Sequence, residues 1–553
     1  MKRKRCGFII LLLILLCLPR DGAAALFEQL AVDSRGSTLA NSITADPQGP
    51  MSIHYNPAGL DRVRGTEFDM GIFYVPVLNN QGHFTQGTDP ATGKPWAPFG
   101  GWFNNGIDPE AGRDSSTTPS VSLPFVGKLP FMVGPYNGIA HHDKDSPFAY
   151  GIAVYAPFAV GLEHKDPNDP YRFLGASQSI VRMVISPGVS YRLTNNLSIG
   201  ASFGWGLSFM GFNTRMRAPN DMVALTGALG EATKGLEIPI ISELTFPAPW
   251  FGGGLNPYED MGGLKFFAQD AFNTSYNFGI LWEPFSWLSF GGVYQSQAEA
   301  DMKGKYRFDY SDRMQKTINW MGSSPLTIII AAMLGLPTSC PAAEEGNMSI
   351  DIVYPQRVQI GMKLQPIPRV KFLVDANWTE WSAWKQTEIV FDHDMKQLQM
   401  ARLMGYQGGP RHLIMINNFK DTWHLTYGLE LQPFHPITLR FGYEYRPSSI
   451  QDNLFGPIPL ADMKLYSVGL GVDLPVPARK FKDLHGFLDQ LQHPDHIDLG
   501  FTYMTSEATV NYNQSRLFNS TDFTGIIYNP FAGLVYHQTT TSYIISINQI
   551  FLF

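Results

Sequence analysis

Residues 437–446 read ITLRFGYEYR, and apolar and polar side chains alternate along the run, with Ile437, Leu439 and Phe441 on one face. Successive side chains of a β-strand point to opposite faces, so this period of two predicts a strand with one apolar and one polar face. The same period recurs in 197–209. We count about fourteen such runs after residue 65, which predicts an all-β chain.

Connection lengths separate a membrane barrel from a water-soluble sandwich, because the strands of both alternate. Tight turns join neighbouring runs at 194–196, 283–286, 365–368 and 433–436. Long connections follow the other strand ends, at 213–270, 301–350 and 382–420. Short turns on one side and long loops on the other are typical of outer-membrane proteins, so we predict a 14-stranded antiparallel transmembrane β-barrel. The stretch 475–495 falls where a short turn is due, and its role stays open.

The last alternating run ends on Phe553, with Ile545 and Ile547 behind it. A strand at the C-terminus can close the sheet against the first strand. A terminal aromatic residue also resembles the C-terminal signal of outer-membrane barrels, so we expect Phe553 to contact the barrel assembly machinery. An edge strand in a soluble domain is the alternative interpretation.

The N-terminus has the features of a secretory signal peptide over residues 1–24. Four basic residues precede a short apolar run, and small residues then favour cleavage after Ala24 or Ala25. Removing the five basic and one acidic residues of this segment changes the formal charge from −7 to −11, so we do not expect nucleic acid as a partner. Cys340 is then the only cysteine, and no internal disulfide can form.

A short motif, Asn56-Pro57-Ala58, lies between the signal peptide and the first run. Here the sequence resembles the FadL-type outer-membrane transporters of long-chain fatty acids and other hydrophobic molecules. Further segments resemble that family in the same order along the chain: 151–158, 278–284 and 378–384. The resemblance implies an N-terminal hatch, or plug, at residues 25–65 in the lumen of a barrel at residues 66–553. It also implies a monomer surrounded by outer-membrane lipid in a Gram-negative bacterium.

The resemblance implies passive, ligand-gated uptake, in which a hydrophobic small molecule is captured outside and leaves sideways past a kinked strand. Asn56, Pro57 and Ala58 would hold the hatch, with simple turn structure as the alternative. Pro157 cannot donate to a strand ladder, so we expect hydrogen bonding to lapse there. That lapse would be the lateral exit, or a bulge without a role.

The resemblance also suggests ligand contacts. Phe27 matches the family's N-terminal aromatic residue and would contact ligand or pack within the plug. A fatty-acid carboxylate needs a cation, and Arg215, Arg217 and Lys385 lie near the family's basic ligand positions, although each could be a solvated loop charge. Two apolar segments in predicted loops would form a capture patch or a loop core: 245–251 and 326–336.

We expect no enzyme activity, no cofactor and no metal site. His141 and His142 are adjacent, so on a strand they would point to opposite faces, and with Asp143 they favour a polar turn. The chain has no nucleophile elbow, zinc-protease motif or phosphate loop. A non-transporting barrel, either a surface adhesin or a barrel enzyme, and a general porin stay open as alternatives.

Overall fold

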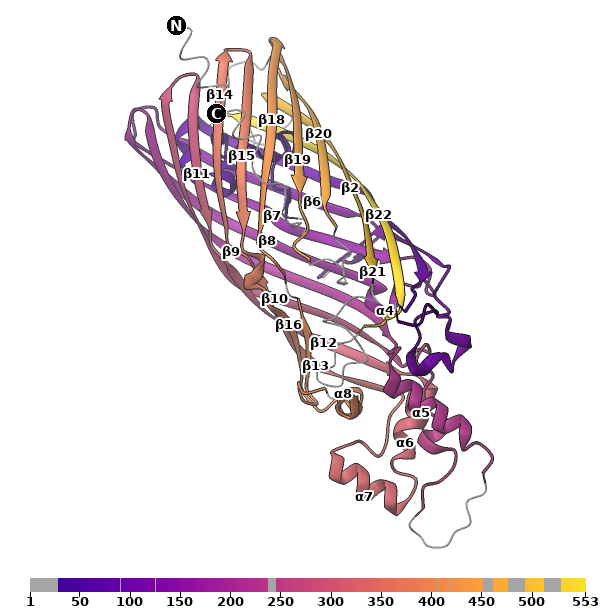
Figure 1. Cartoon of the computed structure of the whole chain (residues 1–553). Coiled ribbons are helices and arrows are strands. Elements are labelled where there is room, and N and C mark those ends of the chain that lie inside the picture. Colours follow the sequence, from indigo (N-terminus) through magenta and orange to yellow (C-terminus); the bar gives the residue numbers. More distant parts are fainter. Residues whose placement is uncertain are drawn as a thin grey trace.

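The computed structural model describes these residues: 28–89, 91–124, 126–236, 245–404, 406–417, 419–450, 461–475, 493–511 and 529–553. The predicted signal peptide, Phe27 and most of the stretch 475–495 lie outside the described residues. Strands dominate the described part and form one tall barrel, with helices gathered mainly at one end (Figure 1).

The barrel wall is a single closed antiparallel sheet. In the described ranges its fourteen positions, five of them built from two strands in line, hold β2 (Gly65–Gln86), β6 (Met132–His142) with β3 (Asp114–Pro119), β7 (Phe148–His164), β8 (Ser177–Thr194), β9 (Leu197–Met216), β10 (Gly262–Phe285), β11 (Leu288–Gln295) with β12 (Ala298–Tyr310), β14 (Arg357–Ile367) with β13 (Ala343–Tyr354), β15 (Val370–Thr379) with β16 (Gln386–Phe391), β18 (Thr422–Phe434) with β17 (His412–Ile416), β19 (Ile437–Arg446), β20 (Met463–Asp473), β21 (His496–Asn511) and β22 (Leu534–Leu552). Strand β22 pairs with β2, where Phe551 lies opposite Phe68, and this pairing closes the sheet. The predicted 14-stranded barrel is confirmed.

The wall extends further than the sequence predicted, because strands occupy parts of the expected long connections. Within 301–350, for example, β12 continues to Tyr310 and β13 begins at Ala343. The outward side chains of this part of β12 are charged and exposed, including Lys303 and Arg307. In this part of β12, charged side chains stand on the outward face where apolar ones stand lower on the wall. The ladder of backbone hydrogen bonds nevertheless continues.

The outer face of the wall carries an apolar belt. On β7, for example, Phe148 and Tyr150 are 58% and 57% exposed. The inner face is polar, and on β19 the side chains of Arg440, Glu444 and Arg446 are buried. The predicted alternation on β19 therefore separates an outward apolar face from an inward polar face, as in barrels that stand in lipid.

Residues 32–63, here called the luminal segment, fill part of the lumen at the end of the barrel that carries the short turns. All but three of these residues are buried. Glycines on β9, β10, β11 and β18 to β21 face the segment from around the wall. At Gly279, for example, an added Cβ would overlap the side chain of Asn56, so the close approach requires glycine. The luminal segment contains α2 (Ser34–Thr38), α3 (Ser52–Tyr55) and η1 (Pro57–Arg62).

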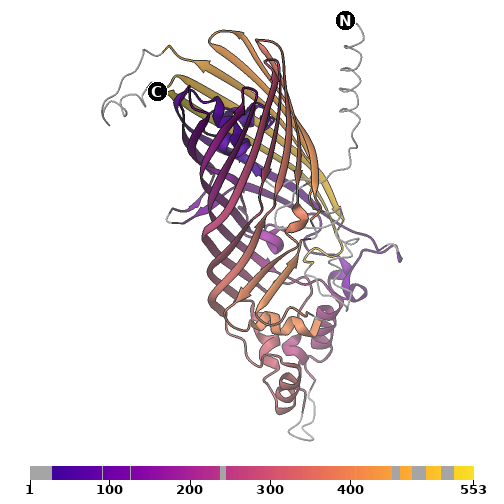
Figure 2. The ribbon, with the colours of Figure 1, turned by 90° about the vertical axis from the view of Figure 1, so that its left-hand side faces the viewer.

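The remaining elements lie mainly toward the opposite end, called the loop end. They are β1 (Glu28–Ala31), η2 (Pro98–Gly101), η3 (Asn104–Gly106), β4 (Val121–Leu123), β5 (Gly127–Leu129), α4 (Arg172–Gly175), α5 (Asp221–Ala232), η4 (Trp250–Gly253), α6 (Asp312–Trp320), α7 (Pro325–Leu334), η5 (Trp381–Ala383), α8 (Lys396–Ala401) and η6 (Arg402–Met404). Helices α5, α6 and α7 form the tip (Figures 1 and 2). Among the described residues, no single helix has the length and apolar character to cross a membrane; the bent pair α6–α7 meets that test together, by length and composition only.

The two apolar loop segments behave differently. In 245–251, Phe246 stacks on Trp320 of α6 with ring centroids 6.0 Å apart, so this segment packs partly as a loop core. The stretch 326–336 forms most of α7, on which Ile329 and Met333 are 51% and 79% exposed. This apolar segment is therefore a short helix with much of its apolar surface uncovered.

Candidate functional site

The Asn56-Pro57-Ala58 motif joins the luminal segment to the wall. The Asn56 amide donates hydrogen bonds to the carbonyl oxygens of Thr44, within the segment, and of Ile280 on β10, both at 2.9 Å. Its side-chain oxygen accepts from the backbone N–H of Ala58 at 3.2 Å, which caps η1, and Pro57 occupies the first turn of that helix. One buried side chain thus fixes a turn and a tertiary contact together.

A buried ion cluster also joins the luminal segment to the wall, at β14 and β15. Its centre is Asp46, whose carboxylate lies 2.7 Å from both Arg35 and Arg62 and 3.2 and 3.5 Å from Lys371 and Lys363 of the wall. Burial alone would raise the pKa of Asp46, but the four surrounding cations hold it well below its ordinary value. The carboxylate therefore stays charged and ties segment to wall.

The β7 strand is irregular at the predicted position. The register of β7 against β8 shifts between Tyr155 and Phe158, which places Pro157 in the bulge. The β6–β7 ladder ends at Val154, and the β3–β7 ladder begins only at Leu162. Among the described residues, no ladder pair joins β6 to the intervening stretch of β7, which we call the side opening (155–161).

The short strand β1 lies at this side opening. Glu28 and Ala31 pair with Phe158 and Ala156 of β7 in an irregular antiparallel register. The chain that leads into the luminal segment therefore runs along the part of β7 that lacks β6. The predicted lapse of hydrogen bonding lies at Pro157, and its role in gating stays a prediction.

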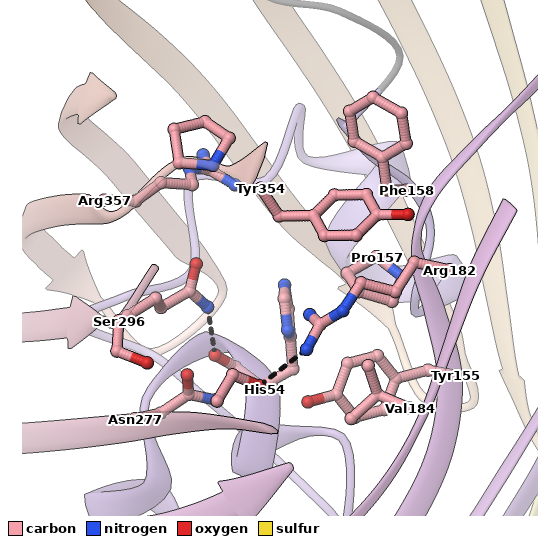
Figure 3. Close-up of a pocket in the computed structure, with 13 residues that line it drawn as sticks. His54, Tyr155, Pro157, Phe158, Arg182, Val184, Asn277, Ser296, Tyr354 and Arg357 are labelled. Atoms are coloured by element: carbon pink, nitrogen blue, oxygen red, sulfur yellow. Dashed lines mark hydrogen bonds between the residues drawn. The ribbon is translucent and has the colours of Figure 1, made fainter. Parts of the chain in front are cut away.

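A cavity of about 70 Å³ lies on the inner side of the bulge. Its walls include Pro157 and Phe158 of β7, Arg182 of β8, Tyr354 of β13 and His54 of the luminal segment (Figure 3). The volume suits a head group or a few waters rather than a whole long chain. Four separate parts of the fold therefore meet at the site where the wall is interrupted.

Arg182 places a positive charge at this cavity. Its side chain is buried, donates from Nε to the Asn273 oxygen at 2.8 Å and from Nη2 to the Ser275 hydroxyl at 3.0 Å, and lies over the Tyr354 ring at 5.1 Å. All of these partners are neutral, and the Arg182 guanidinium forms no ion pair within 4.0 Å among the described residues. Because buried charges are normally paired, the site is suited to an anion supplied from outside.

His54 faces the same cavity without adding charge. Burial, with the nearby positive charges of Arg357 and Arg182, lowers the pKa of His54 to about 3. The imidazole is therefore neutral at physiological pH. It packs edge-on against Tyr155, with ring centroids 4.8 Å apart.

The cations predicted from the sequence lie elsewhere. Arg217 is buried in an ion pair with Asp108, with N–O distances of 2.7 and 2.9 Å. Arg215 pairs with Asp260 at 2.6 Å, and Lys385 is exposed. None of the three lines the cavity. Their contact with ligand stays a prediction, as does that of Phe27.

Sequence reasoning missed Arg182, Tyr354 and His54. A signal for Arg182 was present, because it is the one charged residue in the stretch 177–191, on the inward face of β8. The other two have no such signal, since only the tertiary fold brings α3 and β13 to the bulge.

The histidine pair ends strand β6, so the polar turn predicted for His141 and His142 is wrong, and the chain turns only after them, between Asp143 and Ser146. His141 lies 2.8 Å from the Thr66 hydroxyl, and the buried His142 lies 2.9 Å from the Val63 carbonyl oxygen. The two rings have opposite orientations, as their adjacency on a strand predicted. Within the described ranges, no group of three or more histidine, cysteine or acidic residues could hold a metal ion.

The model of the family "Outer membrane protein transport protein (OMPP1/FadL/TodX)" matches residues 19–527. The chain belongs to this family. Family membership confirms the predicted resemblance and places the protein in the outer membrane of Gram-negative bacteria. Its members are transport proteins for hydrophobic compounds, and that general function extends to this chain.

Solved structures agree with the fold. A Pseudomonas aeruginosa FadL homologue matches with a TM-score of 0.62 at 15% identity, covering 96% of this chain and all of that one. The Pseudomonas putida toluene transporter TodX gives 0.54 at 13% identity, covering 93% and 98%. The CymD monoaromatic hydrocarbon channel gives 0.52 at 13%, covering 96% and 100%. No curated protein sequence matches the chain. At these identities the structural matches show the fold alone.

Proposed function

We propose that this family member takes up hydrophobic molecules that carry an anionic head group, of which long-chain fatty acids are the simplest class. The observation that carries the proposal is Arg182, a buried guanidinium with only neutral partners beside the bulge of β7. A carboxylate in the cavity would complete its charge balance. A toluene-like hydrocarbon has no negative charge to balance this cation.

The route follows from the same geometry. Residues 25–65 would act as a hatch that blocks the straight path through the barrel, anchored by Asn56, Pro57 and Ala58 at β10. A ligand whose head group reaches Arg182 would lie beside Pro157 and could leave through the side opening into the membrane. Transport would be passive and ligand-gated, and Phe27, next in sequence to the paired Glu28, would contact the ligand.

The test compares ligands that differ only in the head group. Purified protein in detergent is titrated with oleic acid, oleyl alcohol and toluene, using the wild type, Arg182→Met and the charge-retaining control Arg182→Lys. A hydrogen bond to a charged group contributes about 1.5–3 kcal/mol, so Arg182→Met should bind oleate about 10- to 100-fold more weakly. The affinities for the alcohol and for toluene should not change.

Two outcomes would contradict the proposal. Equal binding of oleate and oleyl alcohol by the wild type would show that no cation reads the head group. Tighter binding of toluene than of oleate would favour an aromatic hydrocarbon as the substrate. The general function of the family would survive both results.

A further inference from the structure

The β4–β5 hairpin lies outside the barrel wall. The backbone N–H of Ser120 donates to the Gly161 carbonyl oxygen at 3.0 Å, and that of Ser122 donates to the Ser179 hydroxyl at 3.3 Å. Ser179 stands on the same face of β8 as Val189, which is 53% exposed on the outer surface. After β3 the chain therefore leaves the wall and crosses its outer face (Figure 2).

A row of small residues makes room for this crossing. Gly161, Ser179 and Gly211 are direct neighbours on β7, β8 and β9. An added Cβ at Gly161 would overlap the Ser120 carbonyl oxygen, and one at Gly211 would approach the Ser122 side chain. The wall thus has a shallow outer groove, and the hairpin occupies it.

One face of the hairpin packs on the wall and its tip points away. Val121 is 4% exposed, and Leu123 and Leu129 are partly buried against the same apolar cluster that contains Val121. At the tip, Val126 is 63% exposed. The returning chain places the Phe131 ring 6.0 Å from that of Tyr74, which belongs to the apolar belt. The exposed side of the hairpin is therefore continuous with the lipid-facing surface.

The hairpin also borders the side opening. It connects β3 to β6. The pairing of β3 with β7 bounds the side opening at Leu162, and the pairing of β6 with β7 bounds it at Val154. Lys128 forms an ion pair with Glu163, just beyond the last residue of the opening. This polar pair marks the upper boundary of the apolar belt at this point. A ligand that left here without cover would expose hydrocarbon to water, at a cost of about 0.8 kcal/mol per CH₂.

We propose that the β4–β5 hairpin is a lip inserted into the outer leaflet, with Val126 in contact with lipid acyl chains. The lip covers the outer mouth of the side opening and lets a departing ligand pass from protein to lipid without meeting water. Its position in the membrane follows from the hairpin geometry alone. Its part in transport rests on the proposed sideways exit.

The first test locates the tip. A nitroxide is attached at Val126→Cys in a Cys340→Ser background, and the full chain is reconstituted in phosphatidylcholine vesicles. Collisions with oxygen, which concentrates in lipid, are compared with collisions with a water-soluble nickel chelate. Tyr150→Cys, on the belt, is the lipid reference, and Thr92→Cys, on an exposed loop, is the water reference. We expect position 126 to match Tyr150; a match to Thr92 would overturn the proposal.

The second test measures the role of the lip. Val126→Asp puts a charge in the leaflet, whereas Val126→Leu keeps the tip apolar. We expect Val126→Asp to slow oleate entry into the vesicles about tenfold, equal to about 1.4 kcal/mol, with unchanged oleate binding in detergent. Equal rates for both variants would refute the role in exit. If the wild type moves no oleate at all, the sideways-exit proposal fails with it, and the labelling result still decides where the hairpin lies.

Discussion

Asp46 offers the sharpest test of how the luminal segment is held. Its side chain is 3% exposed and forms ion pairs with two arginines of the segment and two lysines of the wall. Removing one partner of a buried ion pair costs about 3–5 kcal/mol. Asp46→Asn keeps the shape and removes the charge, so the equilibrium constant for detachment of the luminal segment should rise about 10²- to 10⁴-fold.

Two assays report this detachment. Single-channel recording in planar bilayers detects openings of the lumen, and limited proteolysis detects cleavage within residues 32–63. The matched control is Glu283→Gln, because Glu283 also pairs with Arg62, at 2.5 Å, but its side chain is 38% exposed. An exposed pair contributes about 0–1 kcal/mol, so this control should change little. Equal effects of the two variants would refute the reasoning.

The same residue predicts a pH dependence. The pKa of Asp46 in the folded protein lies well below its ordinary value of 3.8, so its contribution is fully present above pH 3.8 and is lost only as the pH falls below that value. The difference in opening frequency between wild type and Asp46→Asn should therefore be constant between pH 8 and pH 5. A difference that shrinks within this range would show that Asp46 does not stay charged.

Three further predictions concern the segment and the loop end. The contribution of His54 to docking of the luminal segment should fall by about 2 kcal/mol between pH 6.5 and pH 5, because docked His54 has a pKa of about 3 and a released imidazole binds a proton; the difference between wild type and His54→Gln in the proteolysis assay should change with pH by this amount. Gly279→Ala should expose the segment to protease, since the new Cβ meets Asn56, whereas Gly292→Ala on the neighbouring strand, whose Cβ would meet only the end of the Ile280 side chain, should not. Arg217→Met should destabilise the loop end by about 3–5 kcal/mol in thermal unfolding, with unchanged oleate affinity; a loss of affinity would return Arg217 to the ligand site.

The strands could be predicted because their pattern is local. In ITLRFGYEYR the two faces meet different surroundings, lipid and polar lumen, so the sequence carries a clear period of two, and β19 spans the predicted residues. The pattern failed where the surroundings on the two faces became alike. Above the apolar belt the outward face of β12 meets water, so Lys303 and Arg307 replaced apolar residues and the strand looked like a loop.

The site was only partly predictable, for a different reason. Pro157 predicts a break in the hydrogen-bond ladder of its own strand, because proline has no backbone N–H to donate in any fold. Arg182 is an ordinary inward residue of β8 until the curvature of the wall brings Tyr354 over its guanidinium. Conversely, Arg217 carries the positive charge that an anionic ligand would need, but in the folded protein it forms an ion pair with Asp108.

The sequence by itself determined the alternating strands, the short and long connections, the hatch motif and the proline of the bulge. Each of these depends on the chemistry of neighbouring residues and on the solvent they meet. Only the tertiary structure decided which cation lacks an anionic partner within the described chain, how far along β7 the wall lacks its β6 partner, and that the β4–β5 hairpin crosses the outside. Those properties depend on closure of the barrel, which places residues hundreds of positions apart within a few ångströms and so fixes which charges are paired and which surfaces stay open.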